Sequence, residues 1–354
     1  MTLRFVNSAL LILMVVLTIT GVYGLMWTLA GWMFEVHRAA GWALIALIPW
    51  KAIISLRSLR RGLGPGFDRS LGIVVSVVLS AVTLVVLGLA VLWVWRLGPT
   101  ELWLRQTAIS WHWLLALGLL LPFGLHAWRR WPHPKESDFA SRRGFLKLLA
   151  LGVAGVTGWG AAEAIARWRA TVEAPRRFTG SREQGSFSGN QFPITNSAGE
   201  GEGRIDTSSW KLILHGTVGS PLQLSYENLL ALFSAEITAT IDCTLGWYST
   251  QVWRGVLLSD LFTSANLNPQ ARAVRLKAAT GYAHVFTLDE AHEILLATHV
   301  DGEPLDHWHG FPVRVVVPSR RGWFWVKWLT EIQVMADAVG SVPDPARTLG
   351  HHTM

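Results

Sequence analysis

The chain has little cysteine and little charge. Its 354 residues contain one cysteine, Cys243, and only 16% of them are charged. A single cysteine excludes an intramolecular disulfide, so the thiol needs another explanation. A lone cysteine is most often an inert core side chain, but it can also act as a nucleophile or as the one protein ligand of a soft metal. The flanking residues Asp242 and Thr244 leave all three open.

Charge is almost absent from four long apolar runs in the first half of the chain. Residues 5–34 and 70–95 carry none, and residues 106–128 carry only histidines. The run at about 37–56 has Lys51 in its interior. Because about 20 apolar residues cross a bilayer core of about 30 Å, the runs predict a four-helix transmembrane domain over residues 1–130.

The net charge of +7 is concentrated between these runs, which is typical of membrane topology and argues against a nucleic-acid partner. The cations that follow the second and fourth runs are Arg57, Arg60, Arg61, Arg69, Arg129, Arg130, Lys135, Arg142 and Arg143. The loops at 31–38 and 96–105 carry fewer. By the positive-inside rule, both ends of the four-helix domain face the cytoplasm.

Three histidines in the apolar runs are candidate metal ligands. His37 and His112 fall at matching depth near the outer surface, as the two axial ligands of a b-type haem require. His126 follows His112 by 14 residues, about 21 Å along a helix, and on the same face. The position 14 residues after His37 is Lys51, a poor haem ligand. We therefore expect one outer haem and keep His126 as a candidate ligand of a second. The alternative is that these histidines are polar interface residues.

Short motifs around these histidines extend the argument to a family. They are His37-Arg38, Gly41-Trp42, Trp111-His112-Trp113 and His126. In these motifs, residues 1–130 resemble the cytochrome b561-like family of bacterial membrane electron carriers. The resemblance implies haem b, and electron exchange with the quinone pool or a soluble carrier.

Residues 141–147 read Ser-Arg-Arg-Gly-Phe-Leu-Lys and fill every position of a twin-arginine export motif. The uncharged stretch 148–162 that follows has the length of a signal-peptide apolar region. Ala162-Glu163-Ala164 loosely fits a cleavage site, so the segment is either cut or kept as a fifth helix. We expect residues 131–170 to be a cytoplasmic linker with this signal. The twin-arginine machinery would then export a folded domain, already loaded with its cofactor, to the periplasmic side.

The second half of the chain has mixed polar composition, short alternating strands and few helices, which predicts an α+β domain over 175–335 and a mobile tail over 336–354. Three segments resemble the molybdopterin-binding domain of the sulfite oxidase family, in the style of its exported bacterial branch, which includes the periplasmic methionine sulfoxide reductase catalytic subunit. They are Trp210 to Leu222, Cys243 with Trp253–Leu261 as a trailing helix, and His309-Gly-Phe-Pro-Val-Arg314 with Lys327.

This resemblance implies a role for each matching residue. Cys243 would bind molybdenum beside the two dithiolene sulfurs of the pterin. His309, Arg314 and Lys327 would bind the pterin phosphate. Asn190 and Thr280 would contact the pterin. Without the resemblance, Arg314 and Lys327 would be interpreted as a strand-end cation and a solvated edge residue. Arg254, Arg320 and Arg321 are further cationic candidates, although no clear arginine cluster for a sulfite anion is present.

Together these features predict a multidomain protein, an all-α transmembrane four-helix bundle followed by an α+β molybdopterin domain. Its predicted function is that of a membrane-anchored molybdenum-dependent oxidoreductase that reduces a small S- or N-oxide with electrons from haem b. The alternatives are oxidation of a small sulfur compound, and a non-catalytic haem carrier with a vestigial molybdopterin fold. Membrane lipid, the quinone pool and a small-molecule substrate are the expected partners.

Overall fold

The computed structural model describes residues 3–26, 31–62, 67–97, 102–130, 141–169, 177, 179–195, 203–318 and 320–338, without the side chains of residues 31, 58–72 and 105. The chain divides into two compact units, Met1–Gly180 and Ser181–Met354. The whole predicted linker, residues 131–170, falls inside the first unit. The predicted tail lies outside the described residues from residue 339 onward.

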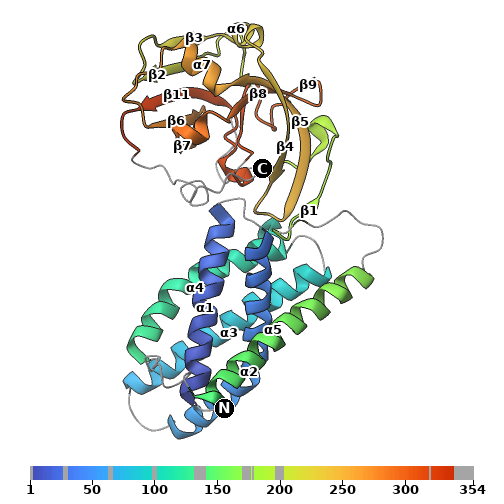
Figure 1. Cartoon of the computed structure of the whole chain (residues 1–354), viewed down its shortest axis with the longest axis vertical. Helices are drawn as coiled ribbons and strands as arrows, with labels where there is room; N and C mark the ends of the chain where they lie inside the picture. Colours follow the sequence, from blue (N-terminus) through green and yellow to red (C-terminus); the bar gives the residue numbers. More distant parts are fainter. Residues whose placement is uncertain are drawn as a thin grey trace. The chain divides into compact units, whose positions relative to one another are not determined.

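The first unit is a bundle of long helices (Figure 1). These are α1 (Leu3–Met26), α2 (Gly31–Gly62), α3 (Phe67–Trp95), α4 (Ala108–Arg130) and α5 (Arg142–Arg169). All 5 contain a segment long and apolar enough to cross a membrane. The expected bundle of four helices is therefore not confirmed, because the segment taken as a linker forms a fifth long helix.

Helix α5 packs directly on α2. A Cβ atom added to Gly155 would lie 2.5 Å from the carbonyl oxygen of Ala39, and one added to Gly158 would lie 3.2 Å from Cβ of Trp42. Only glycine allows so close an approach of the two backbones. Near the end of α5, Glu163 lies 3.8 Å from Arg38, close to the start of α2, so the two helices are antiparallel. The segment predicted to carry the export signal is thus part of the bundle.

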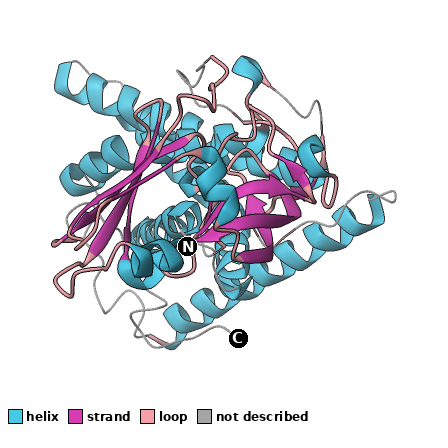
Figure 2. Cartoon of the chain, turned by 90° about the horizontal axis from the view of Figure 1, so that it is seen from above, coloured by secondary structure: helices cyan, strands magenta, loops and turns pink. Residues whose placement is uncertain are grey.

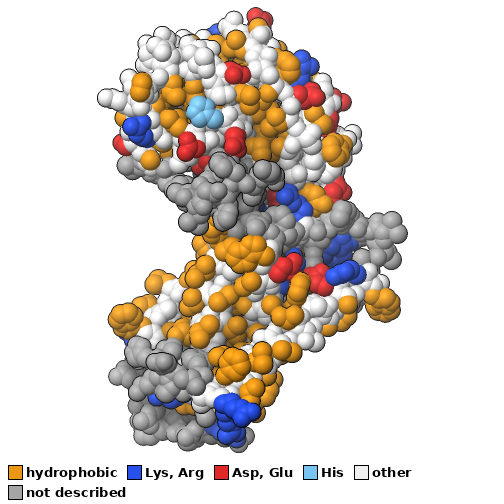
Figure 3. Space-filling view, in the orientation of Figure 1, with side chains coloured by type: hydrophobic (Ala, Val, Ile, Leu, Met, Phe, Trp, Pro, Cys, Tyr) orange, Lys and Arg blue, Asp and Glu red, His pale blue; other side chains and the backbone are white. Residues whose placement is uncertain are grey.

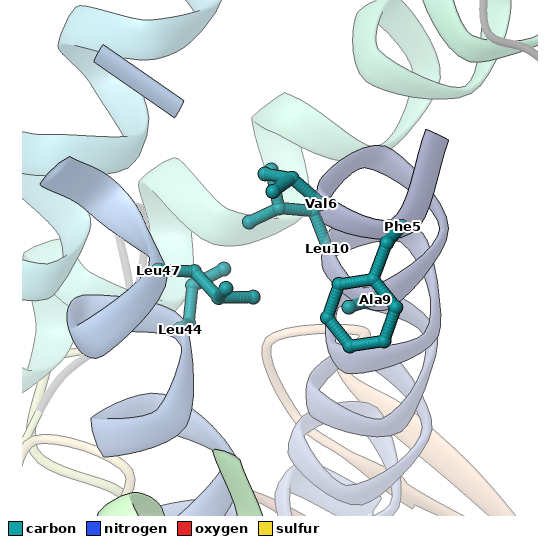
Figure 4. Packing of buried hydrophobic residues seen from close by; sticks show 6 residues of the cluster. All are labelled: Phe5, Val6, Ala9, Leu10, Leu44 and Leu47. Atoms are coloured by element: carbon teal, nitrogen blue, oxygen red, sulfur yellow. The ribbon is translucent and has the colours of Figure 1, made fainter. Parts of the chain in front are cut away.

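Helices α1 and α2 are also antiparallel. Hydrogen bonds join Thr20 to His37 at one end and Asn7 to Lys51 at the other. Figure 4 shows the apolar contact between them. Its buried side chains are Phe5, Val6, Ala9, Leu10, Leu44 and Leu47. Of the cations used to predict orientation, Lys135 and the side chains of Arg60, Arg61 and Arg69 lie outside the described residues.

Large apolar side chains lie on the outside of the bundle. Hydrophobic groups are spread over its visible face (Figure 3), and Leu121, Val153 and Trp168 are 72%, 57% and 87% exposed. An aqueous surface rarely tolerates so much contiguous apolar area, whereas lipid accepts it. The surface therefore agrees with the predicted transmembrane helices.

The second unit contains two sheets, visible as two groups of strands in Figure 2. The 6-stranded sheet has the order β1-β5-β8-β10, with β4 paired to β5 and β9 to β8. The 5-stranded sheet has the order β3-β2-β11-β6-β7. Two pairs are parallel, β1 with β5 and β11 with β2, and the others are antiparallel.

The strands are β1 (Arg182–Glu183), β2 (Leu212–Gly216), β3 (Leu222–Leu224), β4 (Ala235–Asp242), β5 (Trp247–Leu257), β6 (Ala273–Ala278), β7 (Ala283–Thr287), β8 (Leu295–Val300), β9 (Glu303–Pro304), β10 (Arg314–Val316) and β11 (Leu329–Met335). The helices are α6 (Tyr226–Ala231), α7 (Leu258–Ser264) and α8 (Leu288–Ala291). This mixed α and β arrangement is the expected class. One local prediction is wrong: Trp253 to Leu257 completes strand β5, and the helix begins only at Leu258.

Candidate cofactor sites

Cys243 lies in the tight turn that joins β4 to β5. Its N–H donates to the carbonyl of Trp247 at 2.8 Å, and the N–H of Gly246 donates to the carbonyl of Cys243 at 3.0 Å. Gly246 has a φ of +92°, a left-handed backbone conformation that residues with a Cβ atom rarely adopt. The turn therefore needs this glycine, and it holds Cys243 at the end of a strand with 8% of its surface exposed.

The sulfur of Cys243 is surrounded by hydrogen-bond donors. The N–H of Leu245 donates to Sγ at 3.5 Å, and Oγ1 of Thr195 lies 3.6 Å from it. Because Nε1 of Trp247 donates to the same Thr195 oxygen at 3.2 Å, the hydroxyl proton of Thr195 remains available for the sulfur. Both donors favour a thiolate.

Burial acts in the opposite direction. It raises the pKa of the Cys243 thiol above its usual value, and the Leu245 N–H, the Thr195 hydroxyl and the charge of Arg321 offset part of that effect. A thiol with a raised pKa is a poor nucleophile at neutral pH. A bound metal cation removes the proton outright, so this environment suits a metal ligand better than a nucleophile.

Arg321 lies on the backbone side of the Cys243 turn. Its Nη2 donates to the carbonyl of Cys243 at 3.2 Å and lies 3.5 Å from Oδ1 of Asp242. The same carboxylate oxygen accepts a hydrogen bond from Oγ of Ser181 at 2.6 Å. Arg321, Asp242 and Ser181 are 5%, 0% and 1% exposed. A buried ion pair therefore supports the turn.

The residues expected to bind a phosphate meet around Gly310. This glycine has a φ of +110°, and a Cβ on it would lie 3.1 Å from Cγ of Lys327 and 3.2 Å from Cβ of Arg314. Nη1 of Arg314 donates to the carbonyl of His309 at 3.0 Å. The structure thus brings together the three residues that the sequence places up to 18 positions apart.

Thr195 connects this group to Cys243. Its carbonyl accepts a hydrogen bond from Nζ of Lys327 at 2.9 Å, while its hydroxyl lies beside the sulfur. Arg314 and Lys327 are only 5% and 8% exposed, so neither is the solvated cation of the alternative interpretation. Two buried cations at one glycine, next to a buried thiol, fit a ligand with a phosphate at one end and a metal at the other.

His309 and Asn190 bond protein groups. Nε2 of His309 lies 2.9 Å from the carbonyl of Phe192, and Nδ1 lies 2.8 Å from Oδ1 of Asp306. Asn190 donates to the carbonyl of Pro304 and accepts from the N–H of Asp306, both at 2.9 Å. These contacts fasten the loop 303–309 to the segment 190–192. Their direct contact with a pterin stays a prediction.

Thr280 lies in the turn between β6 and β7. Its hydroxyl accepts from the N–H of Tyr282 at 3.3 Å. The neighbouring N–H of Ala279 donates to the carbonyl of Trp328, the residue after Lys327, at 2.9 Å. Contact between Thr280 and a cofactor stays a prediction, as for Asn190.

The three further arginines have different positions. Arg321 lies at Cys243, as described above. Arg320 forms a buried ion pair with Glu290, with 2.6 Å between Nη2 and Oε1. Arg254 lies over the ring of Phe233 at 4.1 Å and is exposed. Neighbours in sequence, such as Arg320 and Arg321, thus have unrelated partners.

Sequence reasoning missed several residues of this site, among them Thr195 and Asp306. Thr195 stands after the Asn190 loop in an ordinary polar context, and nothing in its flanking residues predicts a contact with Cys243. Asp306 precedes His309 by three positions, and this spacing is a weak indication of the observed hydrogen bond. Among the described residues, no three His, Cys, Asp or Glu side chains come together as a metal site.

The bundle brings His37 and His112 together. Their ring centroids are 6.4 Å apart. Nδ1 of His37 lies 2.8 Å from Oγ1 of Thr20, whose own proton goes to the carbonyl of Val16 at 2.6 Å. Nδ1 of His112 lies 2.9 Å from the carbonyl of Val86. Both oxygens accept, so each Nδ1 carries the proton and each Nε2 is left as a lone-pair donor for a metal.

This separation fits axial ligation. With a metal–nitrogen bond of about 2 Å on each side, two imidazole centroids would lie roughly 6 Å apart. At the other end of the bundle the corresponding arrangement differs, because Nζ of Lys51 donates to Oδ1 of Asn7 at 3.0 Å. His126 lies in α4 without an imidazole at the matching position of α2. Its role as a second haem ligand stays a prediction.

Comparison with known proteins finds a matching family for most of the second unit. Residues 199–342 match the family described as oxidoreductase molybdopterin binding domain. The uncharacterized oxidoreductase YuiH of Bacillus subtilis is 37% identical over 131 residues, which are 36% of this chain and 66% of that protein. A sulfite oxidase of Arabidopsis thaliana is 31% identical over 167 residues, which cover 36% of this chain and 42% of that one.

A nitrate reductase [NAD(P)H] of Hordeum vulgare is 30% identical over 165 residues, 37% of this chain and 18% of that one. The crystal structure of the sulfane dehydrogenase SoxCD from Paracoccus pantotrophus covers 39% of this chain and 41% of its own, at 25% identity and a TM-score of 0.37, too low to carry an argument. The chain thus spans just under two thirds of YuiH and less than half of these other proteins. The matches support a molybdenum-dependent oxidoreductase.

Proposed function

We propose that this chain, whose C-terminal unit is an oxidoreductase molybdopterin-binding domain of the sulfite oxidase family, is a membrane-anchored enzyme with its own haem. The observation that carries the proposal is the position of Thr195. Its hydroxyl lies beside the sulfur of Cys243 and its carbonyl accepts from Lys327. One residue thus links the only thiol of the chain to the buried cations.

The side chains present fit molybdopterin. Cys243 would supply the single thiolate, while Arg314 and Lys327 would hold the phosphate, with His309, Asn190 and Thr280 nearby. When bound, the molybdenum supplies two-electron redox chemistry and oxygen-atom transfer. The protein stabilises the thiolate through the Leu245 N–H and the Thr195 hydroxyl.

The pair His37 and His112 would hold a haem b. The Nδ1 atoms of the two imidazoles are held by Thr20 and Val86, which leaves the Nε2 lone pair of each for a metal. A haem there would carry single electrons between a membrane donor, such as quinol, or a soluble carrier, and the molybdenum. We take reduction as the direction because a haem in the membrane has access to quinol.

The charges beside Cys243 favour a neutral substrate. Arg321 is paired with Asp242, which reduces the net positive charge that the site offers to an anion such as sulfite. A sulfoxide or an N-oxide is neutral as a whole molecule and fits this balance better. Oxidation of a small sulfur compound is the second candidate, favoured by the similarity to a protein named sulfite oxidase.

Helix α5 would remain in the mature protein as a fifth membrane helix. Ala162, in the sequence that loosely fits a cleavage site, is 2% exposed, and the adjacent Glu163 pairs with Arg38. A peptidase would have to pull this segment out of the bundle. With the amino end of α1 in the cytoplasm, five helices deliver the second unit to the periplasmic side, after export by the twin-arginine machinery.

The test is the composition and activity of the full chain, purified in detergent from a host that makes molybdopterin. We expect about one molybdenum and one haem b per chain, and oxidation of a reduced viologen dye by a sulfoxide or an N-oxide. If the protein instead oxidised sulfite with an electron-accepting dye, the result would favour the second candidate. A chain with haem but no molybdenum would contradict the proposal and indicate a vestigial molybdopterin fold.

A further inference from the structure

The geometry points to Arg321 as a positioning residue for the metal thiolate, with a second effect on the metal through its fixed charge. This inference rests on the proposed function, because it needs a metal at Cys243. It concerns a part of the site outside the phosphate-binding residues.

The first argument is the contact itself. The Arg321 guanidinium donates to the carbonyl of the very residue whose sulfur would bind the metal, at 3.2 Å. That carbonyl also closes the turn by accepting from the N–H of Gly246. Loss of the guanidinium would leave the turn with fewer constraints on its backbone, and the direction of the Cys243 side chain depends on that backbone.

The second argument is how firmly Arg321 is held. Asp242 accepts from Ser181 and pairs with Arg321, and all three are at least nine-tenths buried. The next residue, Gly322, packs on the same strand, because a Cβ on it would lie 3.1 Å from Cγ1 of Ile241 and 3.4 Å from the carbonyl of Asp242. The arginine is therefore fixed to strand β4 from two sides.

The third argument is charge. An arginine stays protonated at every physiological pH, so it brings a permanent positive charge close to Cys243. The Nε atom of Arg321 is buried and has no hydrogen-bond acceptor among the described residues, so one N–H donor of this guanidinium is unused. Reduction of a metal adds negative charge to the site, and a nearby cation stabilises that state. Arg321 should thus raise the reduction potential of the metal, and Asp242 should lower it.

The experiment compares the wild-type full chain with Arg321→Gln and Arg321→Lys. The molybdenum electron paramagnetic resonance (EPR) signal reports the ligand geometry, and a redox titration of that signal reports the potential. In Arg321→Gln we expect an altered signal and a lower potential, by about tenfold in the one-electron equilibrium, equivalent to about 59 mV. Arg321→Lys keeps the charge but lacks the planar fork, so its signal should change while its potential stays closer to wild type.

Arg254→Gln is the matched control, because it removes the same charge from an exposed site over Phe233. Its signal and potential should equal those of wild type. Asp242→Asn should move the potential upward, opposite to Arg321→Gln. Molybdenum content and the unfolding temperature are measured for every variant, so that an unfolded protein is recognised.

An Arg321→Gln protein that holds molybdenum with the wild-type signal and potential would overturn the inference. If Arg321→Gln contains no molybdenum, the Arg321→Lys variant is the test. An EPR signal of Arg321→Lys equal to that of wild type would also overturn the inference. Failure of the proposed function is a separate result, because in that case the wild-type chain itself contains no molybdenum.

Discussion

The two candidate cofactor sites of this chain are built in different ways. The bundle site consists of two side chains from α2 and α4, each oriented by one hydrogen bond from its Nδ1 atom. The site at Cys243 consists of loop residues from segments far apart in sequence, joined through Thr195 and Gly310. Helices give regular positions to their side chains, whereas loops depend on tertiary contacts. The first site can therefore be predicted from spacing and the second only from resemblance.

The two units also treat the same residue type differently. Trp128 and Trp168 on the helices are 85% and 87% exposed, whereas Trp253 and Trp328 in the second unit are 0% and 1% exposed. Lipid, like a protein core, accepts the apolar surface of tryptophan, so the exposed positions agree with the predicted membrane spans. Hydrophobicity alone thus does not distinguish a core position from a lipid-facing one.

The largest effect should come from Cys243→Ala. We expect complete loss of the dye-linked activity and of the molybdenum EPR signal, because the protein offers no other thiolate. The reduced haem spectrum of the same sample should equal that of wild type, which is the internal control. If the variant retained a full complement of molybdenum, Cys243 would not be needed to hold the metal, and the assignment of this site would be wrong.

The reciprocal variant is His112→Ala. It removes one of the two axial ligands, so haem should be lost from the purified protein, while the activity with a reduced dye remains. His126→Ala is the control on the same helix and should keep the haem of the His37/His112 pair. Equal loss of haem in both variants would show that the ligand pair is assigned incorrectly. The absorbance of the reduced protein measures both.

The stability of the second unit should depend on pH through His284. Burial lowers the pKa of His284 to about 4, from its ordinary value of 6.5. Between those values the unfolded chain binds a proton that the folded chain does not bind. The free energy of unfolding should therefore fall as the pH drops from about 6.5 to about 4, by roughly 3 kcal/mol at most.

His284→Phe removes this proton and should flatten the dependence on pH. Chemical denaturation followed by tryptophan fluorescence measures it, with haem absorbance as the separate signal of the bundle. An equally steep slope in the variant would assign the effect to other groups of the domain.

The smallest effect concerns the contact between α5 and α2. Gly155→Leu puts a side chain where a Cβ already meets the Ala39 carbonyl, and should destabilise the bundle by about 1–3 kcal/mol. Gly152→Leu is the matched control, since a Cβ there meets nothing within 4 Å. Thermal loss of haem absorbance compares the two. Equal behaviour would indicate that α5 is not an integral part of the bundle.

Several features were predictable because they depend on local pattern. Uncharged runs predict the long helices, and the matched depth of His37 and His112 predicts their meeting. Strand β4 before Cys243 follows from the alternation in residues 237–242. The number of bundle helices was not predictable from the sequence. The short apolar run 148–162 is the middle of a longer helix, α5, which has charged residues at both ends and approaches α2 closely at Gly155.

By itself, the amino-acid sequence determines the long apolar helices, the positions of the histidines along them and the presence of a single thiol, since each follows from composition and period along the chain. The tertiary structure decides what surrounds that thiol. Thr195 and Arg321 reach Cys243 from two other segments of the chain, and Arg320, the neighbour of Arg321, pairs with Glu290 instead. Such contacts depend on how loops are packed, and loop packing has no period that can be recognised in a sequence.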